Sequence, residues 1–254
     1  MRTEAELIAA ANHSYTGSYR TLARHCPDGE ILDVDGIFVF ATGIPFALFN
    51  GCVVADPAAP ESLDRAIDWV AERGVPHRVW IADTVVPELG HVPLAHGLRA
   101  RDSPYPGMVL HPVPEPPPPA EGVVVEAVAP ADLEAFLQCS IDTGMPPDAA
   151  RQLFSPSFAA DPDVKLFIGS LDGRPVGTAV AVRTGDVSGV YAVGTLPAAR
   201  RRGVGSALTW AAVAAGRAWG CDTIVLQASE MGYPIYVAMG FRTVVEYAQY
   251  TAAP

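Results

Sequence analysis

Hydrophobic residues in the first 110 positions change from helical spacing to short β-type runs near Glu30. Before that point, the spacing predicts a helix over about 4–13 and a second helical piece that ends near 27–29. After it, β-branched and aromatic runs separated by turn dipeptides such as Asp35-Gly36 predict strands. The expected elements are strands at 31–34, 37–41 and 46–54, a helix from about 62 to 74, a strand at 78–82, a short helix at 87–96 and a strand at 108–110.

The second half of the chain predicts the same order of elements again. The expected elements are a strand at 123–128, helices at 130–140 and 148–154, strands at 164–171, 175–183 and 187–195, a helix at 203–219, a strand at 223–229, a short helix from 234 and a last strand up to 250. Strand, long helix, strand, short helix and strand thus follow one another at 46–110 and again at 187–250. We interpret this order as an internal structural repeat.

A proline-rich stretch separates the two repeats. Residues 112–122 hold six prolines, which favour an extended and semi-rigid polyproline II segment. A proline-rich ligand for a partner module is a weaker alternative, because the position between two repeats already accounts for the composition. We therefore expect three parts, which are a first domain at 1–111, a linker at 112–122 and a second domain at 123–254.

Composition and charge limit the compartments and partners that fit this chain. Half of the 254 residues are apolar, yet no run approaches the ~18 apolar residues of a membrane helix, and the N-terminus lacks the pattern of a secretory leader. We expect a soluble, cytoplasmic protein with no membrane partner. The net charge of −11 argues against nucleic acid, since phosphate backbones bind Lys and Arg clusters. The four scattered cysteines predict buried, reduced thiols with neither disulfide nor zinc.

Three arginines and two glycines lie where a predicted strand gives way to a predicted helix. The sequence there is Arg200-Arg201-Arg202-Gly203-Val204-Gly205-Ser206, which we call the cradle. Backbone amides at a helix N-terminus have no partner in the helix, and the helix dipole adds partial positive charge, so such a site attracts phosphate. Glycine also lets a pyrophosphate approach the amides closely. The plainer alternatives are a glycine-rich turn before an ordinary helix and a basic surface patch.

Two familiar phosphate motifs fit the cradle poorly. A Walker loop needs Gly-Lys-Ser/Thr, but the only lysine is Lys165. The dinucleotide fingerprint needs a third glycine or alanine where this chain has Leu208. The pattern that fits is Val193-x-Thr195-x-Pro197 followed by Arg200-x-x-Gly203-x-Gly205 and an alanine-rich helix, with Tyr236-x-x-x-Gly240-Phe241 further on.

This combination strongly resembles the GNAT acetyltransferases, over most of residues 122–254. The resemblance implies an α/β fold with α+β character, in which a mostly antiparallel mixed sheet is flanked by helices. The first repeat lacks the cradle, because residues 56–61 (Asp-Pro-Ala-Ala-Pro-Glu) offer acids and prolines in place of glycines and free amides. We therefore expect two GNAT-like domains in tandem, the N-terminal one degenerate and the C-terminal one catalytic.

The resemblance also implies a role for individual residues. It implies acetyl-CoA as acyl donor, with no metal, held by Val193, Thr195, Arg200, Arg201, Arg202, Gly203, Val204, Gly205 and Ser206. The backbone at Val193 and Thr195 would pair with the pantetheine arm, and the amides of the cradle would bind the pyrophosphate. Tyr236 is the implied catalytic residue, which would protonate the CoA thiolate, the alternative being a tyrosine of the core.

The acceptor side departs from the family pattern. The family often carries an asparagine where this chain reads Glu230-Met231-Gly232-Tyr233. The base that deprotonates the acceptor is not identified by the sequence; Glu230, Asp142 and solvent are the candidates.

The function expected from the sequence is direct, acetyl-CoA-dependent N-acetylation of a small-molecule or peptide amine. The alternatives are a non-catalytic acyl-CoA-binding regulatory module and a transferase for longer acyl chains. The assembly is left open, with a homodimer among the alternatives.

Overall fold

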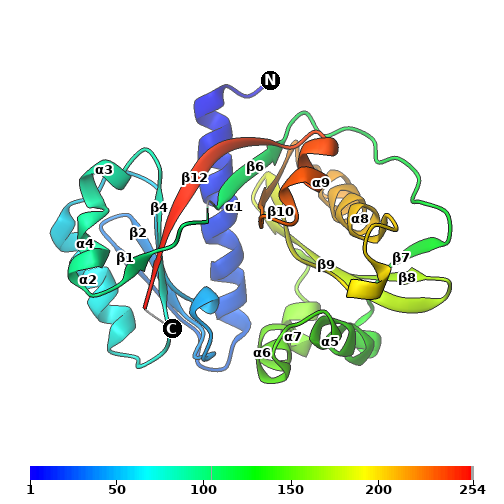
Figure 1. Ribbon diagram of the computed structural model, residues 1–254, viewed down its shortest axis with the longest axis horizontal. Helices are drawn as coiled ribbons and strands as arrows, with labels where there is room; N and C mark the ends of the chain where they lie inside the picture. The colour runs from blue at the N-terminus through cyan, green and yellow to red at the C-terminus, as the bar shows by residue number, and fades with distance from the viewer. Residues whose placement is uncertain (104, 253–254) are drawn as a thin grey trace.

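One continuous sheet runs through the molecule (Figure 1). The computed structural model describes residues 1–103 and 105–252. The strands are β1 (Glu30–Val34), β2 (Ile37–Ala41), β3 (Asn50–Val54), β4 (Arg78–Ala82), β5 (Arg99–Ala100), β6 (Pro106–Leu110), β7 (Val123–Ala127), β8 (Val164–Leu171), β9 (Arg174–Thr184), β10 (Val187–Thr195), β11 (Thr223–Gln227) and β12 (Arg242–Thr251). The sheet has 12 strands in the order β1-β2-β3-β4-β12-β6-β11-β10-β9-β8-β7, with β5 beside β12. Its neighbours are antiparallel except β3–β4 and β10–β11.

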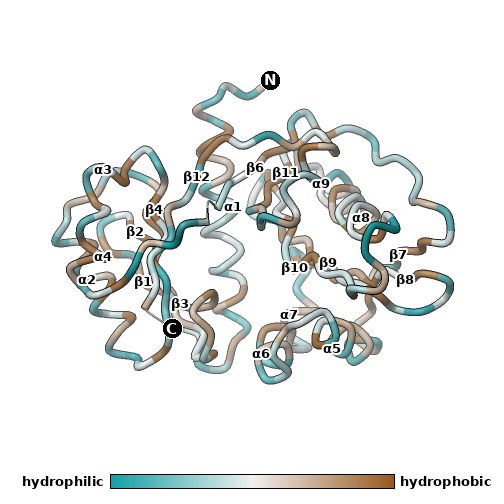
Figure 2. Tube along the Cα trace, viewed as in Figure 1, coloured by the Kyte–Doolittle hydropathy of each residue, from teal (hydrophilic) through white to brown (hydrophobic). Residues whose placement is uncertain are grey.

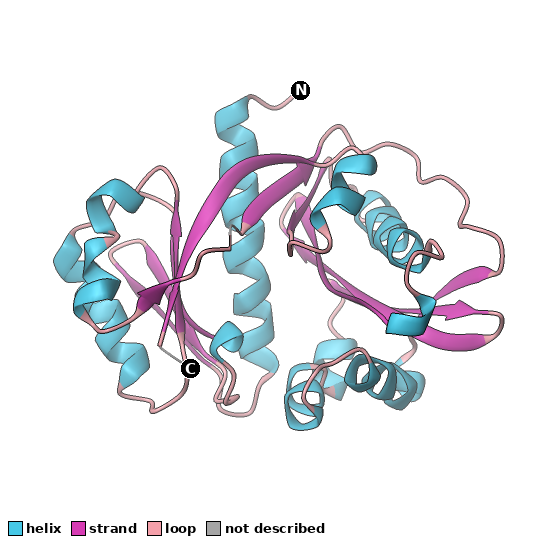
Figure 3. Ribbon diagram, viewed as in Figure 1, coloured by secondary structure: helices cyan, strands magenta, loops and turns pink. Residues whose placement is uncertain are grey.

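Helices cover both faces of this sheet (Figure 3). They are α1 (Glu4–His25), η1 (Ala47–Phe49), α2 (Pro60–Ala71), α3 (Val86–Leu89), α4 (His91–Ala95), η2 (Pro130–Asp132), α5 (Leu133–Asp142), α6 (Pro147–Leu153), α7 (Pro156–Ala159), η3 (Pro197–Ala199), α8 (Val204–Ala218) and α9 (Tyr233–Ala238). Alternation along β9 separates the two faces: Ala179 and Ala181 belong to the core under α8, whereas Val180 and Val182 belong to the core under α5–α7. Apolar residues accordingly gather along the strands (Figure 2).

The last strand of each half crosses to the other half. β6, from the first half, pairs with β11 of the second half, from Ile224↔Leu110 to Gln227↔Gly107. β12, from the second half, pairs with β4 of the first half, and its opening residues pair with β6. The two strands therefore lie side by side at the centre, and we call this β4-β12-β6-β11 region the seam. The sequence led us to expect a separate sheet in each half; the exchange of strands makes one sheet instead.

A single long helix, α1, lies across the seam (Figure 1). A capping box starts it, in which Thr3 and Glu6 satisfy each other's backbone amides. The predicted break after residue 13 is wrong, because α1 is one helix of 22 residues from Glu4 to His25. Gly17 in its middle allows close approach to the sheet, since a Cβ there would lie only 2.3 Å from a methyl of Thr184. Toward the first half, Tyr19 stacks on Phe40 with ring centroids 4.2 Å apart.

Smaller differences from the expected elements have local causes. The strand expected at 46–54 begins only at Asn50, because residues 47–49 form η1. The helix expected at 87–96 is divided at Gly90 into α3 and α4. The four cysteines are free and buried, as expected. In the described part of the chain, no helix is both long and apolar enough to cross a membrane.

A buried tyrosine on β12 ties the exchanged strand to α1. Tyr247 is 1% exposed, its ring centroid lies 5.0 Å from that of Tyr15, and its hydroxyl donates a hydrogen bond of 2.5 Å to Asn12 Oδ1. This side chain holds the seam against the helix, because it makes both the aromatic contact with Tyr15 and the hydrogen bond to Asn12.

Tyr247→Ala should lower the free energy of unfolding by about 3–5 kcal/mol, because it leaves a cavity of aromatic size in the seam. Glu246, the exposed preceding residue on β12, provides the control. Glu246→Ala should change stability by no more than about 0.5 kcal/mol. Chemical denaturation of the two variants measures the difference, and equal losses would show that the seam does not depend on Tyr247.

Candidate functional site

Two neighbouring strands of the second half diverge within the sheet. In the described residues, the parallel ladder between β10 and β11 ends after 187–189. β11 continues along β6 as far as Gln227, while a register shift and a φ of 50° at Ala192 bend β10. The edge of β10 that faces β11 is therefore open over about 190–195. An open strand edge can bind an extended ligand through backbone hydrogen bonds.

α8 begins at the far end of this open edge. Its N-cap, Gly203, has φ 81° and ψ −3°, and Ala207 N–H donates to Gly203 O at 2.9 Å. The amides of Val204, Gly205 and Ser206 come before this first helical donor, so no helical carbonyl is placed to accept from them. With the helix dipole, this end of α8 suits an anion.

The cradle arginines are exposed around the same helix end. Arg200 Nε donates to Thr195 O at 3.3 Å, which ties the cradle to the end of β10. Arg202 Nη2 lies 3.9 Å from Asp172 Oδ2, and both side chains are more than half exposed. Such a surface pair is weak, so the cationic groups stay available to a phosphate.

The two cradle glycines serve different needs. Position 203 requires glycine because its positive φ disfavours any side chain. A Cβ there would also lie 2.8 Å from Ala120 Cβ of the linker. At Gly205, a Cβ would meet only Thr195 Oγ1, at an ordinary 3.7 Å. The clearance at Gly205 is therefore not used by the protein's own packing and remains for a ligand.

Tyr236 lies at the other end of the open edge, on α9. Its side chain is 9% exposed and packs edge-on against Phe241, with ring centroids 5.9 Å apart. Burial raises the pKa of the Tyr236 phenol to about 12. Within the described residues, no hydrogen bond occupies its hydroxyl. The hydroxyl is therefore open to a ligand, and the catalytic role of Tyr236 stays a prediction.

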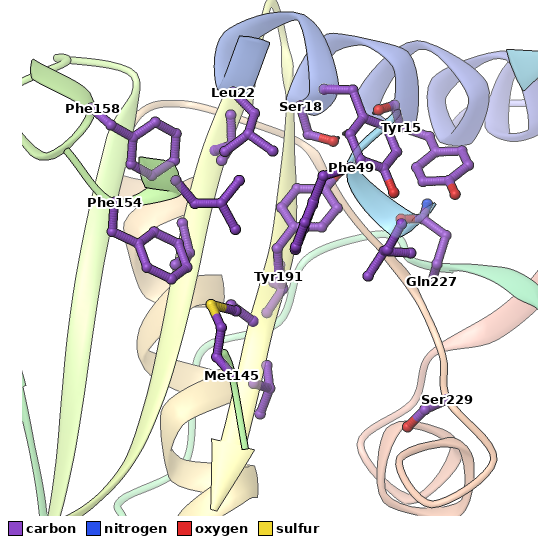
Figure 4. A pocket seen from close by; sticks show the side chains of 18 of the residues that line it. Tyr15, Ser18, Leu22, Phe49, Met145, Phe154, Phe158, Tyr191, Gln227 and Ser229 are labelled. Atoms are coloured by element: carbon purple, nitrogen blue, oxygen red, sulfur yellow. Dashed lines mark hydrogen bonds between the residues drawn. The ribbon is translucent and has the colours of Figure 1, made fainter. Parts of the chain in front are cut away.

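A cavity of about 280 Å³ lies beside the diverging strands (Figure 4). Both halves of the chain line it. The first half contributes α1 and η1 side chains, among them Tyr15, Ser18, Leu22 and Phe49. The second half contributes Met145, Phe154 and Phe158 from the segment that contains α6 and α7, together with Val193 and Tyr236. The seam therefore shapes this cavity as much as the second half does.

The structure brings the sequence-predicted residues together along one line. The cradle, Thr195, Val193 and Tyr236 follow one another from the start of α8, along β10, to the cavity. The candidate bases do not line the cavity itself: Glu230 lines a neighbouring hollow that shares Ser229 with the cavity, and Asp142 accepts a hydrogen bond from Gln138. The sequence missed Gln227 and the α1 side chains, because neither belongs to a motif and only the tertiary fold carries them to the cavity.

Comparison with known proteins agrees with this geometry. The model of the acetyltransferase (GNAT) family matches residues 133–241. Over these residues, the second half of the chain is similar to the GNAT acetyltransferase family. No curated protein matches the chain.

Several solved structures share the fold over more than this half. A GCN5-related N-acetyltransferase from Kribbella flavida is 21% identical, with a TM-score of 0.70 over 100% of this chain and 97% of that one. A tandem GNAT protein from the clavulanic acid biosynthesis pathway is 13% identical, with a TM-score of 0.58 over 86% and 79%. A functionally unknown conserved protein from Staphylococcus epidermidis is 12% identical, with a TM-score of 0.62 over 89% and 94%. At these identities, the likeness concerns the fold alone.

Gly205→Glu should weaken acetyl-CoA binding by about 100-fold or more, because a carboxylate would face the phosphates across the freed space. The fold should persist, since an acid in the first turn of a helix is favourable and the site has room for a side chain. Gly205→Ala is the control for the fold and should not lower the melting temperature. Calorimetry that finds wild-type affinity in Gly205→Glu would rule out the cradle as the phosphate site.

Proposed function

We propose that the second half, residues 123–254, binds acetyl-CoA and transfers its acetyl group to an amine. The observation that carries the proposal is the open edge of β10, which has the cradle at one end and Tyr236 at the other. GNAT acetyltransferases take the acetyl group from acetyl-CoA. An open strand edge next to a free helix N-terminus fits a molecule that has an extended arm and a pyrophosphate.

The binding roles follow the order of residues along this edge. The backbone of Val193 and Thr195 would hold the pantetheine arm as an added strand would be held. The amides of 201–206 would bind the pyrophosphate, and the arginine side chains would face its outer oxygens.

Acetyl-CoA supplies the acetyl group as a thioester. Direct transfer forms a bond between the amine nitrogen and the acetyl carbon and breaks the bond from that carbon to sulfur. The nitrogen gives up one proton, and the departing sulfur takes up one. Tyr236 lines the cavity at the end of the open edge, where the sulfur would lie.

The pKa of Tyr236 decides how its hydroxyl would act. With a pKa of about 12, the phenol stays protonated at neutral pH. A phenol is a weaker acid than a thiol even in model peptides, near 10 against near 8.5, so this phenol keeps its proton while it donates a hydrogen bond to the thiolate. We therefore assign Tyr236 the role of hydrogen-bond donor that stabilises the thiolate, while the proton itself comes from the amine nitrogen or from solvent.

The first half, residues 1–111, is proposed as a degenerate GNAT-like domain joined by the linker 112–122. Its parallel pair, β3–β4, stays paired up to Val54↔Ile81 at the end of β3, so no edge opens there. Its long helix, α2, begins at Pro60 with Glu61 in the first turn, which offers an anion one amide fewer and a repelling charge. These differences support a single acetyl-CoA site per chain.

A non-catalytic acyl-CoA-binding module is the second candidate, and the altered segment at Glu230-Met231 is what favours it. Release of free CoA in the presence of a broad amine panel separates the two. A transferase for longer acyl chains would instead bind those thioesters more tightly than acetyl-CoA.

Tyr236→Phe should lower kcat by about 10²- to 10³-fold, the usual loss when one donor to a developing negative charge is removed. Acetyl-CoA affinity and melting temperature should change little, because the ring keeps its packing and the hydroxyl forms no hydrogen bond with the residues that the structure describes. Steady-state kinetics, calorimetry and thermal unfolding of this one variant provide all three readouts. An unaltered kcat would assign the stabilisation of the thiolate to another group or to water.

Calorimetric titration should give one acetyl-CoA per chain. In a variant that carries Gly205→Glu, the binding heat of this one site should disappear at the concentrations used for the wild type, because the cradle is then blocked. A stoichiometry of two would show that α2 and β3 bind the cofactor despite Pro60 and Glu61.

A further inference from the structure

The cavity beside Tyr236 has a chemical character that narrows the acceptor, provided that the proposed acetyl transfer holds. Among the residues that the structure describes, no Asp, Glu, Lys, Arg or His lines it. Its walls are mainly aromatic and aliphatic side chains, such as Phe49, Phe154 and Phe158. Its volume of about 280 Å³ is at the lower limit of ordinary ligand pockets, which are about 300–1,000 Å³. The site therefore suits a small molecule.

An uncharged wall favours some amines over others. An ammonium group loses most of its hydration on burial and finds no carboxylate here, so desolvation favours its neutral form. A monoamine can give up its proton to solvent as it enters and arrive as the nucleophile that acyl transfer requires. A polyamine or an aminoglycoside would have to bury further charges, each without a partner. The aromatic rings would offset only part of that penalty through cation–π contact.

Within the described residues, two side chains of the wall, Tyr15 and Gln227, have buried polar atoms without a hydrogen-bond partner, and only Gln227 leaves both a donor and an acceptor unpaired. Gln227, the last residue of β11, lies next to the point where β10 and β11 diverge, and it is labelled in Figure 4. Both its amide nitrogen and its amide oxygen are buried and make no hydrogen bond. Buried amide groups are rarely left unpaired, because each missing hydrogen bond is unfavourable. A ligand group that both donates and accepts, such as a hydroxyl or an amide, would satisfy this side chain.

We propose that the acetyl acceptor is a small monoamine whose body is aromatic or aliphatic and which carries one neutral hydrogen-bonding group that pairs with the Gln227 amide. The amine nitrogen is directed to the Tyr236 end of the cavity. The apolar body lies among the side chains of α1, η1 and the α6–α7 segment. Gln227 is thus a specificity-determining residue rather than a catalytic one.

Two matched pairs of probes test this proposal: 2-phenylethylamine with tyramine, and pentylamine with 5-amino-1-pentanol. In at least one pair, the wild-type protein should have the higher kcat/KM for the hydroxylated member. At least one of the four monoamines should also be a better acceptor than spermidine and than a lysine-containing peptide. Gln227→Leu should reduce the preference for the hydroxyl by about 5- to 100-fold, since the hydroxyl would then be buried without a partner.

Gln138→Leu is the matched control, because Gln138 is exposed on α5 and does not line the cavity. It should leave the ratio of kcat/KM values within each pair unchanged. The melting temperature of Gln227→Leu should not fall, since the wild-type amide has no hydrogen bond to lose. Calorimetric titration of the preferred hydroxylated amine, with CoA present, should show the same loss of affinity in Gln227→Leu without relying on turnover.

The outcomes separate this inference from the proposed function. Turnover of spermidine or the peptide in preference to every monoamine would overturn the inference and leave the acetyltransferase proposal standing. A hydroxyl preference that is absent, or equal in Gln227→Leu and wild type, would also overturn it. Acetyl-CoA binding without turnover of any amine would overturn the proposed function; the inference would then fail as well unless the titration detects the hydroxylated amine in the cavity.

Discussion

The exchange of the two last strands is the constraint on which the rest of the structure depends. β6 completes the sheet of the second half, and β12 completes that of the first, so each half has backbone hydrogen bonds that only the other can satisfy. Unpaired backbone groups are costly when buried, which makes the two halves one unit. α1 then lies over both halves at once and becomes a wall of the cavity. The cavity is therefore a product of the seam.

Within this shared frame, the two halves differ at one equivalent place. Each contains a parallel strand pair followed in sequence by a long helix. In the first half, the β3–β4 ladder is closed and a proline begins α2. In the second half, the ladder ends at Gly189, and a left-handed glycine begins α8. A few residues thus decide whether the same architecture presents an open edge and free amides or a closed structural surface, and the fold alone does not determine the function.

Sequence reasoning predicted the local structure of the site, while the binding and catalytic roles stay predictions. The turn at Gly203, the free amides after it and the position of Tyr236 depend on residues close in sequence, so their pattern predicts them. The exchange of β6 and β12 was not predictable, because the hydrophobic pattern of a strand does not determine which strand pairs with it. The full length of α1 was missed because the residues after His13 are mostly polar, whereas the structure continues the helix through them and uses Gly17 to approach Thr184. Gln227 looks like the end of an ordinary strand until the fold leaves its amide unpaired.

The distribution of charge divides the site into two environments. The cradle is cationic and exposed, so in the proposed complex the charged phosphates would stay hydrated while they bind. The cavity is neutral: burial raises the pKa of Tyr105 to about 12 and those of Tyr15 and Tyr19 above their ordinary range, so these phenols stay protonated. In such surroundings, a hydrogen bond to a developing charge is stronger than in water. In the proposed reaction, the Tyr236 hydroxyl would therefore act on the thiolate without a charged residue beside it, and the same neutrality would favour the unprotonated amine as nucleophile.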